Sequence, residues 1–379
     1  MKRIILGAMA AVAILACSKE QVIEVNRAND EITFNVVTDN QTKAAAVYCA
    51  NNLFDNFHVS ATYTNGSKTN WFFQNDHIVK NGTSWNNETN TRYWSAAGTH
   101  DFYAIYNGTM THTGISEAPA APQVVDFKVE ANVKDQKDLL YAVATGYKKT
   151  DKKAVALNFR HALSQVVFQA KNTNPNLYVE ISGVSVCNVA NVGTFTYPTV
   201  STAVNYVNHT NQVSGEAIAA GTQGTWNALT GGEADYNVKF NPVIAVAGNS
   251  NVCALTTATT PEYNANTMLL LPQATTAWNP AGSNYTTGSY LLVDCIIYNV
   301  AGTAYKEGTD AVLYSGTVAI PAAFNWAQGK KYIYTFVFGN GNGGYIPGGN
   351  EPVLAPIDYT VAVDDFAPVA NQDVPMEAE

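Results

Sequence analysis

The chain has 379 residues, of which 46% are hydrophobic and only 13% charged, with a formal net charge of −9. A hydrophobic share of this size supports a large core, and the length accommodates two domains of ordinary size. The acidic balance excludes a nucleic-acid interface, which requires clustered lysine and arginine. Abundant tyrosine, threonine, asparagine and valine favour strands and turns over helices.

Residues 1–16 have the features of a signal peptide. Lys2 and Arg3 precede an apolar run that is too short to span a bilayer. The run ends in Leu15-Ala16-Cys17, which resembles the lipobox of bacterial lipoproteins. That resemblance implies cleavage before Cys17 and lipid attached to its thiol. The alternative is an ordinary secretory signal followed by an incidental cysteine.

Residues 17–30 are polar and are predicted to form a tether. Removal of residues 1–16 takes away Lys2 and Arg3 and changes the net charge from −9 to −11. A chain this acidic would not bind an anionic membrane through its charge, so we expect the lipid on Cys17 to provide the membrane anchor.

The other four cysteines are too far apart in the sequence for a zinc finger or a CxxC redox motif. Two disulfides are possible in an exported protein, but two of the cysteines lie in strand-like runs, where a free thiol packs as a small hydrophobe. We therefore expect mostly free, structural cysteines. They are Cys49, Cys187, Cys253 and Cys295.

Alternation of apolar and polar residues recurs along the chain and predicts strands. No segment carries the sustained apolar stripe of an amphipathic helix, and clusters of glycine, asparagine, threonine and proline separate the runs. The fold class is therefore predicted to be all-β. In chain order the runs cover residues 32–37, 102–106, 157–160, 166–170, 267–271, 290–298, 331–338 and 357–366.

Two β-sandwich domains in tandem are the simplest arrangement for these strands. The charged stretch Lys148–Lys153 is predicted to be the hinge, which gives an N-terminal domain of residues 31–151 and a C-terminal domain of residues 152–379 with a short acidic tail. The alternation changes parity across His161–Ser164, where we expect a bulge or a short helical turn.

Few residues point to chemistry. The GxGxxG match at residues 339–344 is followed by Tyr345-Ile346-Pro347, which cannot start the helix that a dinucleotide site needs. His161 is predicted to be structural, because no nucleophile motif accompanies it. Asp364-Asp365 lacks the ligand count of a calcium site. We therefore predict no enzymatic activity, no catalytic residues, no metal and no cofactor.

The six tryptophans have two interpretations. They could line a glycan-binding groove, but aromatic residues in β-sandwiches more often belong to the core, and we favour the core. The six are Trp71, Trp85, Trp94, Trp226, Trp278 and Trp326.

Several motifs, in their order, resemble the fimbrillin family of Bacteroidia, the pilin-like lipoproteins of type V pili. The resemblance covers most of the mature chain. It rests on Tyr93-Trp94 with Phe102-Tyr103-Ala104, on the segment 157–166, on residues 181–186 with Gly193-Thr194-Phe195, on residues 268–273, and on residues 326–334.

The resemblance implies two transthyretin-like β-sandwich domains and, in members that polymerise, donor-strand assembly after a trypsin-like protease removes the N-terminal strand. Lys43 lies where the family often carries a Thr-Arg or Thr-Lys step, so it is the possible processing site. We predict that Ile32, Phe34 and Val36 fill an apolar groove as a removable strand.

The candidate donor is the C-terminal strand, in which Ile357, Tyr359, Val361 and Val363 face one way. The alternative is that this strand is simply the last one of its own domain.

Two functions remain open after the sequence. One is a fimbrial stalk or tip subunit that serves adhesion, with other fimbrial subunits as partners and an outer-membrane, surface-exposed location. The other is a surface lipoprotein that binds a glycan or a host protein and does not polymerise. A hydrolase is disfavoured, because no nucleophile–base pair or paired carboxylates are evident.

Overall fold

The fold was analysed in a computed structural model. It is built almost entirely of strands, which confirms the all-β prediction. No helix among the described residues is long and apolar enough to cross a membrane. The described residues are 30–38, 54–82, 84–112, 119–151, 154–201, 221, 223–232, 234–245, 247, 252–255, 267–282, 285, 287–300, 305–339, 344–353 and 357–365.

The N-terminal strands form one sheet that closes on itself, in the order β1-β4-β3-β2-β5-β7-β8. The first strand closes it, because β1 pairs with β4 on one side and in parallel with β8 on the other. The bounds are β1 Phe34–Thr38, β2 Asn56–Asn65, β3 Lys68–Asn81, β4 Ser84–Asn87, β5 Thr99–Tyr106, β7 Leu140–Tyr147 and β8 Val155–His161.

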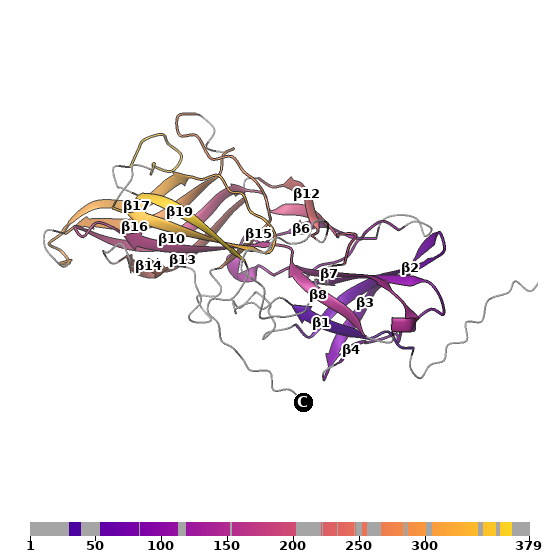
Figure 1. Ribbon diagram of the computed structural model, residues 1–379. Coiled ribbons are helices and arrows are strands. Elements are labelled where there is room, and N and C mark those ends of the chain that lie inside the picture. Colours follow the sequence, from indigo (N-terminus) through magenta and orange to yellow (C-terminus); the bar gives the residue numbers. More distant parts are fainter. Residues whose placement is uncertain are drawn as a thin grey trace, which may run out of the picture.

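The C-terminal strands form two further sheets, ordered β13-β10-β16-β17 and β14-β9-β18-β19, with β15 also paired to β9. Figure 1 shows the indigo and purple N-terminal strands at one end of the molecule and the orange and yellow C-terminal strands at the other. The bounds are β9 Ser164–Asn172, β10 Leu177–Val189, β13 Ala234–Ala245, β14 Val252–Ala254, β15 Met268–Leu270, β16 Tyr290–Asn299, β17 Ala311–Pro321, β18 Lys330–Phe338 and β19 Ile357–Asp365.

A small sheet, β12-β11-β6, lies between these two parts. Its strands are β6 Gln123–Lys128, β11 Val192–Thr196 and β12 Thr225–Thr230. The described residues also contain two short 3-10 helices, η1 Val133–Asp135 and η2 Lys149–Asp151. Tyr197, directly after β11, is buried and donates a hydrogen bond to the carbonyl of Ala104 in β5 at 3.0 Å. Strand β5 is therefore packed against the residues that follow β11 of the small sheet.

The predicted domain boundary lies too early in the chain. Residues 152–161 were assigned to the second domain, but β8 pairs with β1 and β7 and so belongs to the first sheet. Lys149–Asp151 is a turn inside that sheet and not a hinge. The chain changes sheet at Ala162 and Leu163, a buried two-residue bend between β8 and β9.

That bend also explains the change of parity at His161–Ser164. It is neither a bulge nor a helical turn, because the two strands it joins belong to different sheets. Side chains on both faces of β8 and on most of β9 are buried, as expected where a strand is covered on both sides.

Candidate functional site: strand β1 and its groove

The side chains that the sequence assigns to a removable strand all face the interior of the N-terminal sheet. Ile32, Phe34 and Val36 are buried and belong to one apolar cluster. Phe34 lies at the centre of it, with edge-on ring contacts to Phe57 at 6.2 Å and to Phe102 at 5.8 Å between centroids. The three side chains therefore point inward, as their alternation in the sequence predicts.

The backbone of β1 is held mainly by β8. The two strands pair in parallel from Phe34 opposite Val155 to Thr38 opposite Phe159, whereas β1 pairs with β4 only at Phe34 opposite Trp85. Departure of β1 would uncover unpaired amides on β8 and an apolar groove at the same time. Both exposures are costly in water.

Residues before β1 pair with a third segment, Arg92–Trp94. The N–H of Ile32 donates to the carbonyl of Arg92, and the N–H of Trp94 donates to the carbonyl of Asp30, both at 2.8 Å. Glu31 and Tyr93 face each other in an antiparallel bridge between these two bonds. We call Arg92–Trp94 the entry segment, because it contacts the strand where the chain enters the groove.

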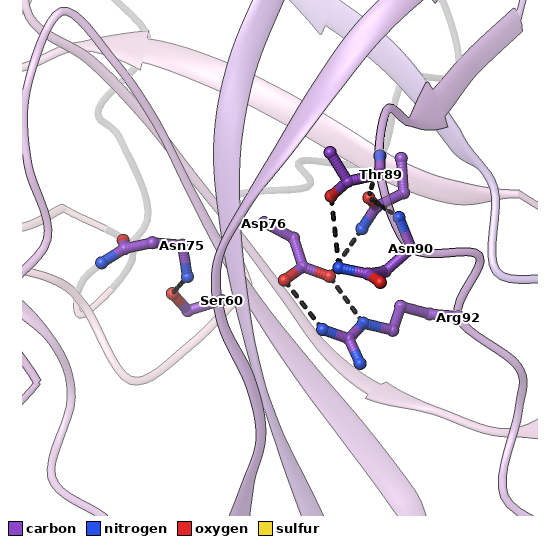
Figure 2. Close-up of polar contacts among 7 residues, drawn as sticks. Ser60, Asn75, Asp76, Thr89, Asn90 and Arg92 are labelled. Carbon is purple, nitrogen blue, oxygen red and sulfur yellow. Dashed lines mark hydrogen bonds and ion pairs between the residues drawn. The ribbon is translucent and has the colours of Figure 1, made fainter.

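The carboxylate of Asp76 on β3 holds the entry segment in place through Arg92. Its two carboxylate oxygens accept hydrogen bonds from Nε and Nη2 of Arg92, at 2.6 and 3.0 Å (Figure 2). The Asp76 side chain is largely buried, and its hydrogen bonds raise the pKa of Arg92 above its ordinary value. The Arg92 guanidinium also lies over the ring of Phe73, 5.2 Å from its centroid. Forked pairs of this kind are among the stronger polar contacts in proteins.

Asn87 joins the same network and shapes the turn that leads to Arg92. Its Nδ2 donates to Asp76 at 2.5 Å. Its Oδ1 accepts from the backbone N–H groups of Thr89 and Asn90, at 3.1 and 2.9 Å. Such Asx turns hold a loop through a single side chain.

A bulge in β3 points Asp76 toward this network. The pairing with β2 shifts between Val59 opposite Asp76 and Ala61 opposite Phe73, and Asn75 has a positive φ of 54°. The N–H of Asn75 donates to Ser60 Oγ at 2.9 Å (Figure 2), which fixes the bulge. Bulges commonly re-aim a side chain in this way.

Ser60 also lies 2.7 Å from His112 through Oγ and Nε2, a pairing that the sequence did not reveal. Ser60 is fully buried in the middle of β2, and burial lowers the pKa of His112. Because this hydroxyl is closed off from solvent and holds the bulge, its geometry is that of a structural hydrogen bond.

The candidate donor strand, β19, lies in its own sheet. It pairs with β18 along its whole length, from Ile357 opposite Phe338 to Asp365 opposite Lys330. Ile357 is buried, but Val361 and Val363 are 45% and 60% exposed. The alternation is as predicted, yet only its first half is covered by the core.

Other predicted residues fall into two groups. Cys17, Lys43 and Cys49 lie outside the described residues. The remaining three cysteines are free, as predicted: Cys187 and Cys295 are buried, Cys253 is half-buried, and burial raises the pKa of all three thiols.

His161 is buried and lies 2.6 Å from Asp138 through Nδ1 and Oδ2, which supports its structural interpretation. Within the described part of the chain, no group of three or more His, Cys, Asp or Glu residues is placed to hold a metal ion.

The tryptophans belong to the core, as favoured. Trp85, Trp94, Trp278 and Trp326 are buried, and Trp71 and Trp226 pack against the main apolar cluster.

Tyrosines gather instead on the outer face of the β10–β16 pair. Tyr305 stacks on Tyr178 with 4.0 Å between ring centroids, and Tyr298 contacts both rings. Within the described residues, no ion pair engages the neighbouring carboxylates of Glu180 and Glu307.

The chain matches a family model described as fimbrillin-like over residues 35–352. No curated protein sequence gives a significant match. Among solved structures, a fimbrial protein from Bacteroides vulgatus superposes with a TM-score of 0.55 at 14% identity, covering 88% of this chain and 99% of that one. At this identity the similarity shows the fold alone.

Two further structures cover similar lengths with lower scores. A protein assigned to cell adhesion in Bacteroides uniformis covers 89% of this chain and 99% of its own, at 16% identity and a TM-score of 0.42. A second protein assigned to cell adhesion, from Bacteroides ovatus, covers 91% of this chain and 100% of its own, at 12% identity and a TM-score of 0.42.

Proposed function

Because this chain belongs to the fimbrillin-like family, we propose that it is a stalk or tip subunit of a fimbrium, exported as a lipoprotein and assembled by donor-strand exchange. The family supports a fimbrial or adhesive role at the cell surface. The finer steps, which are lipid on Cys17, removal of the first strand and its replacement by a neighbour, are our proposal. It assigns no enzymatic activity and no cofactor to the chain.

The observation that carries the proposal is the position of β1. It closes the N-terminal sheet, its three apolar side chains are buried, and its chain continues to Lys43 before the next described residue, Phe54. Cleavage after Lys43 would leave β1 attached to the protein only by noncovalent contacts. Ile32, Phe34 and Val36 stabilise the groove by roughly 5 kcal/mol through burial before entropy is counted. An emptied groove would therefore favour entry of another strand.

The donor is less clearly marked. Ile357, Tyr359 and Val361 repeat the spacing and character of Ile32, Phe34 and Val36, which makes β19 the candidate. Its continuous pairing with β18 favours the alternative, in which it is the last strand of its own sheet. Use of β19 as a donor would require its release from β18.

Polymerisation tests the proposal. The mature chain is incubated with trypsin, and a Lys43→Gln variant serves as the matched control. We expect SDS-resistant ladders from the cleaved protein and none from the variant. A cleaved protein that loses β1 yet stays monomeric and as heat-stable as the intact chain would contradict strand exchange.

A second candidate function, binding of a surface glycan without polymerisation, is favoured by the tyrosine cluster. Stacked, half-buried tyrosines present a flat apolar surface with polar rims, which suits a sugar ring. Binding of the chain to a panel of neutral glycans, compared with Tyr305→Ala, tests this function. Equal binding of the two proteins, or binding by neither, would exclude the cluster as a glycan site.

A further inference from the structure

The outer face of the sheet β13-β10-β16-β17 carries three half-buried tyrosines, Tyr178, Tyr298 and Tyr305, which we call the tyrosine cluster. Ile297 is fully buried in the core, so its neighbour Tyr298 faces the opposite way. Tyr178 of β10 lies directly opposite Tyr298 of β16, and Val312 of β17 continues the same row with an exposed fraction of 56%. The cluster therefore belongs to an apolar surface on the outside of the sheet.

The three rings form a flat surface with an inclined wall. Tyr305 stacks on Tyr178 with 4.0 Å between ring centroids and 11° between ring planes. The ring of Tyr298 is inclined to both, by 52° to Tyr305 and by 62° to Tyr178. Because the stacked rings leave no gap between them, the cluster does not form a cage around a small group. It offers ring faces and hydroxyl groups that suit the flat apolar side of a sugar ring.

Two carboxylates adjoin the tyrosine cluster. Glu180 is two residues from Tyr178 on the same strand and faces the same side, and the exposed Glu307 is two residues after Tyr305. Burial raises the pKa of Tyr178, and the negative charges of Glu180 and Glu307 raise it further, so both act on the same ring.

These carboxylates have no positive partner in the part of the chain that the structure describes. No ion pair there involves Glu180 or Glu307, and the adjacent Lys306 pairs with neither. Two negative charges beside an aromatic surface complement a ligand that carries a positive charge, which the ring faces also attract. The charges therefore distinguish between ligands that the rings alone would accept equally.

We propose that the tyrosine cluster, together with Glu180 and Glu307, is a binding site for an amino sugar. The sugar ring stacks on the tyrosines, and its ammonium group lies near the two carboxylates. The inference rests on the second proposed function, binding of a surface glycan, and names the chemical class of that glycan. A lysine side chain of a protein would also match the charge, but the closed stack of Tyr178 and Tyr305 favours a flat ring over a flexible chain.

A pair of oligosaccharides that differ only in charge tests the proposal. The mature chain is titrated in a calorimeter with oligomers of glucosamine and of N-acetylglucosamine of equal length, in a buffer acidic enough to protonate the free amines. We expect the glucosamine oligomer to bind about tenfold more tightly, through its attraction to two carboxylates. Equal affinities would overturn the amino-sugar class while leaving a glycan site, and binding of neither oligomer would overturn both.

Variants then assign the preference to the two carboxylates. Glu180→Gln and Glu307→Gln should each weaken binding of the glucosamine oligomer about threefold, and the double variant about tenfold, with N-acetylglucosamine binding unchanged. Glu88→Gln is the matched control, because it removes the same charge from an exposed side chain in the N-terminal sheet. It should leave both affinities unchanged.

The aromatic contribution is tested at Tyr305. Tyr305→Ala should weaken binding of both oligomers, whereas Tyr305→Phe, which keeps the ring, should retain the preference for glucosamine. Circular dichroism verifies that each variant is folded. An unchanged affinity of the folded Glu180→Gln, Glu307→Gln double variant for the glucosamine oligomer would show that the proposal is wrong.

A short lysine peptide serves as the third titrant. We expect it to bind more weakly than the glucosamine oligomer, because it has no ring to stack on the tyrosines. If it binds as tightly and loses affinity equally in the double variant, the cluster recognises positive charge on a protein and the amino-sugar proposal fails. The trypsin experiment on strand exchange does not involve these residues, so its failure and the failure of this inference are separate results.

Discussion

Asp138 and His161 form a buried pair, 2.6 Å apart, that joins the segment before β7 to the last residue of β8. The pair lies where the chain leaves the N-terminal sheet for the next one. Its burial makes each partner dependent on the other, since a lone charged group in the interior is strongly destabilising.

Replacement of one partner should therefore unfold the chain more easily. We expect His161→Ala to lower the free energy of unfolding by about 3 to 5 kcal/mol, because Asp138 would be left without its partner. Chemical denaturation measures this loss. The exposed His77 provides the control, and His77→Ala should change stability by less than about 1 kcal/mol.

Phe34 should contribute most of the stability of the filled groove. Phe34→Ala removes a buried ring and is expected to cost about 3 to 5 kcal/mol, whereas Asn35→Ala on the exposed side of β1 should cost little. Thermal unfolding of the two variants makes the comparison. Equal melting temperatures would show that β1 is not part of the stable sheet.

The turn Lys148–Asp151 should be cut by trypsin without releasing a fragment. Lys148 and Asp151 are exposed, but β7 before the turn and β8 after it belong to the same sheet. Gel filtration under native conditions should show one species, and denaturing gels should show two bands. Separation under native conditions would instead support a domain boundary at this turn.

Acid should destabilise the N-terminal sheet through His100. Burial lowers the pKa of His100 to about 4 from an ordinary value of 6.5. The unfolded chain therefore binds a proton more readily than the folded one, and stability is lost as pH falls from about 6.5 to about 4, by roughly 3 kcal/mol. In chemical denaturation, the free energy of unfolding of His100→Gln should fall less steeply with decreasing pH across that range than that of the wild type. An unchanged pH profile would exclude His100 as its source.

Lipid attachment should depend on Cys17 alone. A palmitate analogue fed to cells producing the chain should label the wild type and not the variant Cys17→Ala. Equal labelling of both proteins would contradict the lipobox interpretation.

The sequence predicted the character of the strands better than their partners. Alternation placed Ile32, Phe34 and Val36 on one face, because that pattern depends only on the period of a strand. It could not reveal that β1 pairs with β8, since partners are set by the path of the whole chain. The domain boundary was misplaced for the same reason.

A local alternation of apolar and polar residues also cannot predict whether the apolar face of a strand is buried. Val361 and Val363 continue the alternation of Ile357, yet they are exposed where Ile357 is buried, so no part of the described chain covers that end of β19. The contact between Asp76 and Arg92 had no sequence signal either, because it depends on the bulge at Asn75 and on a turn that brings the two residues together.

The parallel pairing of β1 with β8 has a consequence for folding. Strand β1, the first strand among the described residues, finds its main partner only after every other strand of its sheet has been made. Closing so long a loop is entropically expensive, and folds rich in such distant contacts form slowly. Strands β2, β3, β4, β5 and β7 can associate through pairings between nearby segments, so closure by β1 should be the last and slowest step, observable as a late phase in refolding.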